Sequence, residues 1–249
     1  MINVAISLCP NDIFVFSALL LKAISNPYNF EVYPLGDLNR KLLENRYDFI
    51  KVSSLALINS SEYSVTRVGA SLAKDKGPQL VKAEGSSPTG SVLGVPSLHA
   101  TATKLAKRYY PNLEAKEYPL NQLSSLVSAG EIPYAVIINE DMNRLDELKL
   151  ESVSDLGLTW NQEFDALLPL GVIGAKKTLP KSAISEFERL VNESIEWAKA
   201  NPVKALKLTK KYTGEDDINT DHINLFTQDA HFNPSIPLYL NKLEDSVSI

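Results

Sequence analysis

Residues 2–14 read Ile-Asn-Val-Ala-Ile-Ser-Leu-Cys-Pro-Asn-Asp-Ile-Phe, a short apolar run followed by a polar turn. The near-continuous apolar character of residues 2–7 is typical of a strand that is buried on both faces. A helical pattern follows over Phe14–Ala23, with Asp12 as a candidate N-cap. The stretch therefore predicts the strand-turn-helix unit from which parallel α/β sheets are built.

The same alternation of strands and helices continues along the chain. Further strands are predicted over residues 30–34, 48–52, 65–68, 79–83, 91–95, 114–118, 134–138 and 170–176. Further helices are predicted over residues 38–45, 55–58, 101–109, 120–129, 181–200 and 203–212. The alternation predicts an α/β fold with mostly parallel sheets flanked by helices. The turn-rich stretch Glu84–Gly90 is the best candidate for a domain boundary.

Composition limits the class of protein. The 249 residues are 44% hydrophobic and 22% charged, which suffices for one large core or two modest ones. The net charge is −5 and no basic run is interleaved with aromatic residues, so neither nucleic acid nor an anionic membrane is an expected partner. The oligomeric state is not predicted. The start of the chain has no basic segment, and no apolar run approaches the ~20 residues of a membrane span, so we expect a cytoplasmic protein.

The residues that commonly hold metals are few. Cys9 is the only cysteine, so no disulfide can form within the chain. The histidines His99, His222 and His231 show no metal-ligand spacing. The sequence therefore predicts no metal site.

Small polar residues mark three predicted junctions between a strand and the following helix. They are Pro10-Asn11-Asp12, Ser53-Ser54 and Ala100-Thr101-Ala102-Thr103. Free backbone N–H groups and the positive end of the helix dipole suit such junctions to a carboxylate or phosphate. Each junction alone could be a simple N-cap, but the three together favour a binding cleft for a small anionic organic molecule.

Several short motifs resemble one family in order along the chain. The stretch Ser7-Leu8-Cys9-Pro10-Asn11-Asp12-Ile13-Phe14 resembles the Ser-Pro-Cys-Pro-Asn-Asp-Thr-Phe signature of 1,4-dihydroxy-6-naphthoate synthases, enzymes of the futalosine route to menaquinone. Further matches are Lys51-Val52-Ser53, Gly77-Pro78, Val95-Pro96 with Thr101-Ala102, Val136-Ile137-Ile138 before Glu140, and Pro169-Leu170-Gly171. The resemblance covers roughly residues 2 to 180.

The resemblance implies the two-lobed fold of type-2 periplasmic binding proteins, with two crossing strands between the lobes. Lobe one would combine residues 1–86 with 175–249, and lobe two would span 87–174. Family members cleave cyclic dehypoxanthine futalosine to 1,4-dihydroxy-6-naphthoate without a metal or organic cofactor. By position, the resemblance assigns substrate binding to Asn11, Ser53, Thr101, Ala102, Gly77, Pro78, Leu170 and Gly171. From composition alone, Gly77-Pro78 would be an exposed turn.

The chain departs from the family at the expected catalytic base. Where family members have His-Glu-Gly-Arg, this chain has Asn139-Glu140-Asp141-Met142. Asparagine can orient a substrate but cannot take up a proton near neutral pH. Glu140 and His99 are the candidate replacements, although a histidine in the place of His99 is more often an exposed loop residue. Three interpretations stay open: a lyase with an altered base, a non-catalytic small-anion-binding protein, and a relative of chorismate dehydratase.

Overall fold

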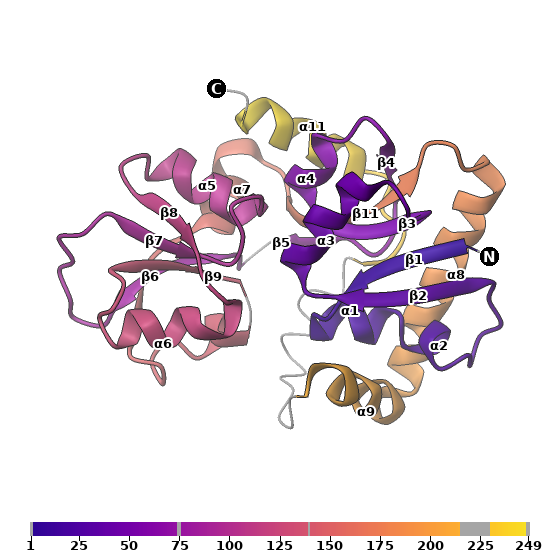
Figure 1. The fold of residues 1–249 in the computed structure, drawn as a ribbon, viewed down its shortest axis with the longest axis horizontal. Coiled ribbons are helices and arrows are strands. Elements are labelled where there is room, and N and C mark those ends of the chain that lie inside the picture. The colour runs from indigo at the N-terminus through magenta and orange to yellow at the C-terminus, as the bar shows by residue number, and fades with distance from the viewer. Residues whose placement is uncertain (1, 74–75, 139, 215–229, 248–249) are drawn as a thin grey trace. The chain divides into compact units, whose positions relative to one another are not determined.

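The chain forms two α/β units, each built on one mixed sheet (Figure 1). A computed structural model describes residues 2–73, 76–138, 140–214 and 230–247. Unit 1 comprises Met1–Leu72 and Gly171–Leu240, and unit 2 comprises Ala73–Leu170 and Asn241–Ile249. The α/β class predicted from the sequence is confirmed.

The sheet of unit 1 has the strand order β2-β1-β3-β11-β4, and β5 also pairs with β11. The strands are β1 (Ile2–Ser7), β2 (Tyr28–Tyr33), β3 (Phe49–Ser53), β4 (Tyr63–Val65), β5 (Ser71–Ala73) and β11 (Leu168–Lys176). β1 runs parallel to β2 and β3, whereas β11 is antiparallel to β3 and β4. Parallel pairing is therefore confined to one side of this sheet.

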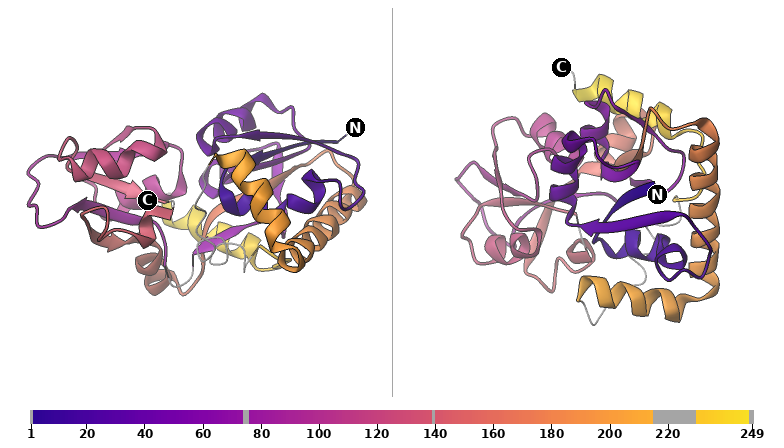
Figure 2. Two further views of the ribbon diagram at one scale, coloured as in Figure 1. Left: turned by 90° about the horizontal axis from the view of Figure 1, so that it is seen from below. Right: turned by 45° about the vertical axis from the view of Figure 1, so that its right-hand side comes forward.

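Helices cover both faces of that sheet (Figures 1 and 2). They are α1 (Pro10–Val15), α2 (Ser17–Leu20), α3 (Leu35–Lys41), η1 (Leu42–Glu44), α4 (Ser54–Ile58), α8 (Lys181–Ala200) and α9 (Pro202–Thr213). On the face covered by α1, α2 and α8, the ring of Phe49 stacks on Phe187 at 3.8 Å between centroids, and Tyr28 meets both rings edge-on. This aromatic cluster fixes α8 against β3, because offset and edge-on ring contacts add directional stabilisation to burial.

The sheet of unit 2 has the strand order β10-β6-β9-β7-β8. Its strands are β6 (Gln79–Ala83), β7 (Val92–Val95), β8 (Glu114–Glu117), β9 (Tyr134–Ile137) and β10 (Leu150–Asp155). Its helices are α5 (Thr101–Tyr109), η2 (Leu120–Gln122), α6 (Leu123–Ser128), η3 (Glu140–Asn143) and α7 (Leu156–Phe164), and α11 (Ile236–Val247) is divided between the units. β7 is parallel to β8 and β9, whereas β6 is antiparallel to β9 and β10.

The observed division differs from the expected lobes 1–86 with 175–249 and 87–174. The chain passes between the units within β5, within β11 and within α11. Glu84–Gly90 instead lies between β6 and β7 of unit 2. The reason is that β6 pairs with β9 and β10, so it belongs to the second sheet although it precedes the turn.

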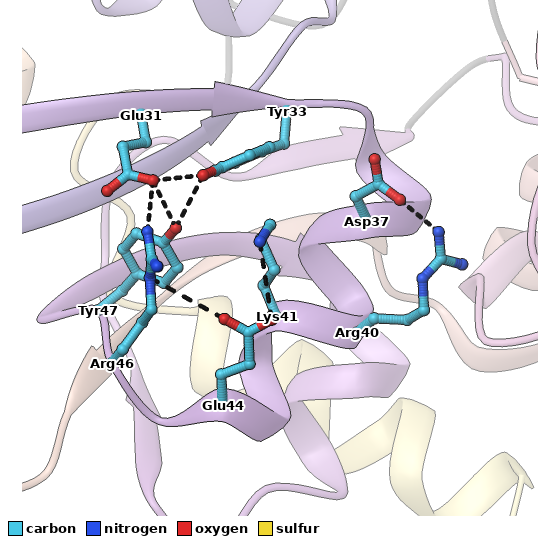
Figure 3. A network of polar contacts seen from close by, with 8 residues as sticks. All are labelled: Glu31, Tyr33, Asp37, Arg40, Lys41, Glu44, Arg46 and Tyr47. Atoms are coloured by element: carbon cyan, nitrogen blue, oxygen red, sulfur yellow. Dashed lines mark hydrogen bonds and ion pairs between the residues drawn. The ribbon is translucent and has the colours of Figure 1, made fainter.

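A polar cluster stabilises β2 at the edge of the unit 1 sheet (Figure 3). The Glu31 carboxylate accepts hydrogen bonds from the Tyr33 hydroxyl, from Tyr47 Oη at 2.9 Å and from Arg46 Nη2 at 2.5 Å. The Tyr33 hydrogen bond, followed by those of Tyr47 and Arg46, holds the pKa of Glu31 below its ordinary value of 4.5. The ionised carboxylate is thus favoured by folding.

The variant Glu31→Gln is expected to be less stable than the wild type at neutral pH and equally stable in acid. A folded-state pKa below 4.5 means that the stabilisation is complete above 4.5 and is lost as the pH falls through the lower folded-state pKa. Urea unfolding midpoints measured across this range check the prediction, with Glu147→Gln as the control because its ion pair with Arg144 joins two exposed side chains. A difference between Glu31→Gln and wild type that stays constant with pH would contradict it.

Candidate functional site

The parallel strands β1 and β3 of unit 1 end at Ser7 and Ser53, at the same edge of the sheet. The helices α1 and α4 follow these strand ends, as predicted for two of the polar junctions. Asp12 is not the N-cap of α1, because the helix begins at Pro10 with Cys9 at the N-cap position. Proline suits the first helical position since its ring presets the backbone and it has no N–H to satisfy there.

Asp12 instead belongs to a buried ion pair. Lys51 Nζ lies 2.9 Å from Asp12 Oδ1, and the two side chains are only 3% and 5% exposed. The ammonium also donates to the Gly69 carbonyl at 2.6 Å and to Ser71 Oγ at 3.3 Å. The second Asp12 oxygen accepts from Ser7 Oγ at 2.5 Å. An ammonium has three protons, so these three acceptors satisfy it and hold the Lys51 side chain in place.

Asn11 joins the same cluster from the start of α1. Its side chain is partly exposed, and Nδ2 donates to Ser71 Oγ at 3.3 Å. The structure therefore brings the predicted residue Asn11 together with Ser71 and Lys51, neither of which was predicted as a site residue.

Ser53 lies at the start of α4, beside Gly171. Its Oγ accepts from the N–H of Ala56 at 3.4 Å, and its own N–H donates to Asn39 Oδ1 at 2.9 Å. Ser53 pairs with Gly171 of β11. A Cβ atom at Gly171 would lie 3.0 Å from Lys51 Cε, which favours glycine in this position.

Two buried polar atoms beside Ser53 are unsatisfied. Ser54 Oγ and Asn39 Nδ2 have no hydrogen-bond partner among the residues that the structure describes. An unsatisfied buried donor is costly, so these two side chains lower the stability of this part of unit 1.

In unit 2 the third predicted junction lies at the start of α5. Thr101 and Ala102 are buried, and Thr101 Oγ1 donates to the Leu170 carbonyl at 3.4 Å. Thr103 Oγ1 donates to the Ser97 carbonyl at 2.7 Å, which fixes the turn before the helix. Thr101 and Leu170, predicted separately, thus contact each other.

Gly77-Pro78 is a buried segment and not an exposed turn. Both oxygens of Asp155 accept from the N–H of Gly77, at 3.1 and 3.2 Å, and Gln79 Nε2 donates to Asp155 at 2.6 Å. A Cβ atom at Gly77 would lie 2.5 Å from the Cα of Gly157, at the start of α7. The two backbones are therefore in contact. The exposed turn expected from composition alone is wrong, because turn residues can also be packed in the interior.

The variant Gly157→Ala is expected to destabilise the protein by about 1–3 kcal/mol, the usual cost of overpacking. Its new Cβ would lie 2.7 Å from Gly77 Cα, which is backbone and cannot rotate away. Chemical unfolding checks this, with Gly90→Ala as the control because its Cβ would meet only Pro133 at 3.2 Å. Alanine normally favours a helix by up to ~1 kcal/mol over glycine, so a stabilised Gly157→Ala variant would contradict the contact.

The candidate bases His99 and Glu140 both belong to unit 2. His99 is exposed, and its backbone N–H donates to Ser97 Oγ at 3.3 Å. Asn139 lies outside the described residues, and Glu140 opens the 3-10 helix η3. The two residues that follow are anchored, since Asp141 Oδ2 accepts from Ser124 Oγ at 2.5 Å and Met142 is buried.

In the described ranges, no three His, Cys, Asp or Glu side chains gather as metal ligands would, and His222 lies outside these ranges. None of the helices that the structure describes combines the length and apolar character of a membrane span.

Solved structures with a similar fold include an archaeal protein and a periplasmic binding protein. The crystal structure of protein AF1704 from Archaeoglobus fulgidus has a TM-score of 0.89 at 25% identity, over 99% of this chain and 96% of that one. The periplasmic aliphatic sulphonate binding protein SsuA from Escherichia coli has a TM-score of 0.69 at 12% identity, over 99% and 85%. The predicted fold of the periplasmic-binding-protein type is confirmed.

Comparisons of sequence identify the family. The family model described as menaquinone biosynthesis matches residues 2–236. A 1,4-dihydroxy-6-naphthoate synthase of Thermus thermophilus is 30% identical over 90% of this chain and 85% of its own length. One of Streptomyces coelicolor is 24% identical over 92% and 85%. With this match over most of its length, the chain belongs to the menaquinone-biosynthesis family.

Proposed function

We propose that this protein is a carbon–carbon lyase that converts cyclic dehypoxanthine futalosine to 1,4-dihydroxy-6-naphthoate without a cofactor. One observation carries the proposal: the Thermus thermophilus relative, 30% identical over 90% of this chain, is a 1,4-dihydroxy-6-naphthoate synthase. The ligand is then a small anionic organic molecule, and we place the reaction in the cytoplasm.

The retained polar residues support this substrate. Asn11 and Ser53 lie at the strand ends of unit 1, and Thr101 and the backbone of Ala102 lie at the start of α5 in unit 2. Hydroxyl, amide and backbone N–H groups are the donors that anionic oxygens require. In the proposal these four residues contribute to substrate binding, and so do Gly77, Pro78, Leu170 and Gly171.

Glu140 is the proposed base. The reaction needs a group that takes up a substrate proton as the carbon–carbon bond breaks. Asn139 has no basic nitrogen and would orient the substrate by hydrogen bonds. Glu140 adjoins that position in the chain, whereas His99 is exposed on the loop before α5. A carboxylate in hydrogen-bond reach of its proton can act as a general base.

The test is incubation of the purified chain with cyclic dehypoxanthine futalosine and detection of dihydroxynaphthoate and the three-carbon fragment by mass. Formation of both products by the wild type is the expected result. Binding without product would identify a small-anion-binding protein instead. Turnover of chorismate in a parallel incubation would favour a dehydratase-like relative. If the protein neither binds nor converts the futalosine, the proposed substrate is wrong and only the fold assignment remains.

A further inference from the structure

Ser71 lies beside the buried ion pair of Lys51 and Asp12 in unit 1, and two neighbouring donors limit where its hydroxyl proton can point. Ser71 Oγ accepts from Asn11 Nδ2 and from Lys51 Nζ, each at 3.3 Å. A serine hydroxyl has two acceptor lone pairs and one proton, so the two donors occupy both lone pairs. The proton must then point away from Asn11 and Lys51, and Ser71 donates to no acceptor within the described ranges.

The neighbours that direct this hydroxyl are held firmly. Lys51 is fixed by Asp12 and by the Gly69 carbonyl, and its stem lies against Gly171. Ser71 itself begins β5, which pairs with β11. Its side chain is partly exposed, unlike those of Lys51 and Asp12, so a ligand can reach the hydroxyl while the ion pair behind it stays covered.

The ammonium also strengthens Ser71 as a donor. A hydroxyl that accepts a hydrogen bond from a charged donor is polarised, and its own proton forms a stronger bond to the next acceptor. Asp12 neutralises the Lys51 charge, so the cluster presents a directed dipole and not a free positive charge. Such a donor suits an oxygen that carries negative charge.

We propose that Ser71 contacts the substrate and donates a hydrogen bond to one of its negatively charged oxygens, with Lys51 and Asn11 as the residues that position it. This inference rests on the proposed function and adds a specificity-determining residue to it. Lys51 does not touch the substrate, since its three protons already have acceptors.

The variants Ser71→Ala and Ser71→Thr test the assignment. Ser71→Ala is expected to lower kcat/KM for cyclic dehypoxanthine futalosine about 10- to 100-fold, the usual effect of one hydrogen bond to a charged group. The melting temperature should stay close to that of the wild type. Ser71→Thr keeps the hydroxyl and should restore most of kcat/KM. Ser64→Ala is the matched control, because its hydroxyl donates to the Ala175 carbonyl at 3.4 Å in β11 of the same sheet.

The outcomes separate the two proposals. An active wild type with an unchanged kcat/KM in Ser71→Ala would overturn the role of Ser71 and leave the lyase proposal standing. A loss in Ser71→Ala that is matched by a large fall in melting temperature and is not restored by threonine would show a structural role only, and would also overturn it. A wild type that neither binds nor converts the substrate would overturn both.

Discussion

Glu140→Gln is expected to lower the rate of dihydroxynaphthoate formation by about 10²–10⁴-fold, the usual loss when a positioned base is removed. Glutamine keeps the size and the hydrogen-bonding oxygen of the side chain but cannot take up a proton. The loss should therefore appear in kcat, with KM changed little, because the substrate contacts proposed for Asn11, Ser53 and Thr101 are untouched. Single-turnover kinetics with mass detection measures the chemical step directly.

Two further variants make this prediction specific. His99→Gln should keep the wild-type rate within about twofold, because His99 is exposed and surface changes rarely affect a site. Asn139→His, combined with Glu140→Gln, should recover activity by supplying an imidazole that can take up a proton near neutral pH. A Glu140→Gln variant with full activity would contradict the proposed base, and loss of activity in His99→Gln would transfer that role to His99.

The sequence predicted best those elements whose pattern is local. The helices α5 (Thr101–Tyr109) and α8 (Lys181–Ala200) have the predicted bounds. Pro180 precedes α8, and both helices carry an apolar face of helical period that packs in its own unit. Local signals of this kind are complete within the element itself, so no distant residue is needed to read them.

The strand β10 and the helix α7 were not predicted. β10 is an edge strand in which Glu151, Ser152 and Val153 are all exposed, so neither an alternating nor a continuous apolar pattern is present. For α7 a signal did exist: Asp155 caps the helix, and its side chain accepts from the N–H of Leu158 at 2.9 Å. Gly157 obscured that signal, because glycine disfavours a helix. The reason for a glycine there is the close contact with the Gly77 backbone, which the sequence does not reveal.

The expectation of mostly parallel sheets failed for a topological reason. Apolar runs predict burial but not direction, and β11 is as apolar as a parallel strand while running antiparallel to β3 and β4. For the site, a lysine within the fully buried strand Phe49–Ser53 was a readable sign of a buried partner. The identity of that partner could not be predicted, because Asp12 and Ser71 are brought to Lys51 only by the pairing of distant strands.

Lys51→Met is expected to lower the free energy of unfolding by about 3–5 kcal/mol, the usual cost of removing one partner of a buried ion pair. The carboxylate of Asp12 would stay buried with Ser7 as its donor, and the Gly69 carbonyl would lose its 2.6 Å hydrogen bond. Urea unfolding followed by fluorescence measures the change. Arg144→Met is the control: its ion pair with Glu147 at 3.1 Å lies on the surface, with both side chains exposed, where such pairs contribute ~0–1 kcal/mol.

The double variant Asp12→Leu with Lys51→Met distinguishes an ion pair from simple packing. The loss of unfolding free energy in Lys51→Met is expected to come mainly from leaving the Asp12 carboxylate buried and unpaired. Replacing both partners by apolar residues should then be less destabilising than the sum of the two single variants. Additive losses would mean that the two side chains act independently. Both variants that lack Lys51 also remove a donor that directs the Ser71 proton, so both should have a lower kcat/KM than the wild type. The double variant should therefore be more stable than Lys51→Met without a higher kcat/KM. Recovery of both would show that Lys51 is not needed to orient Ser71.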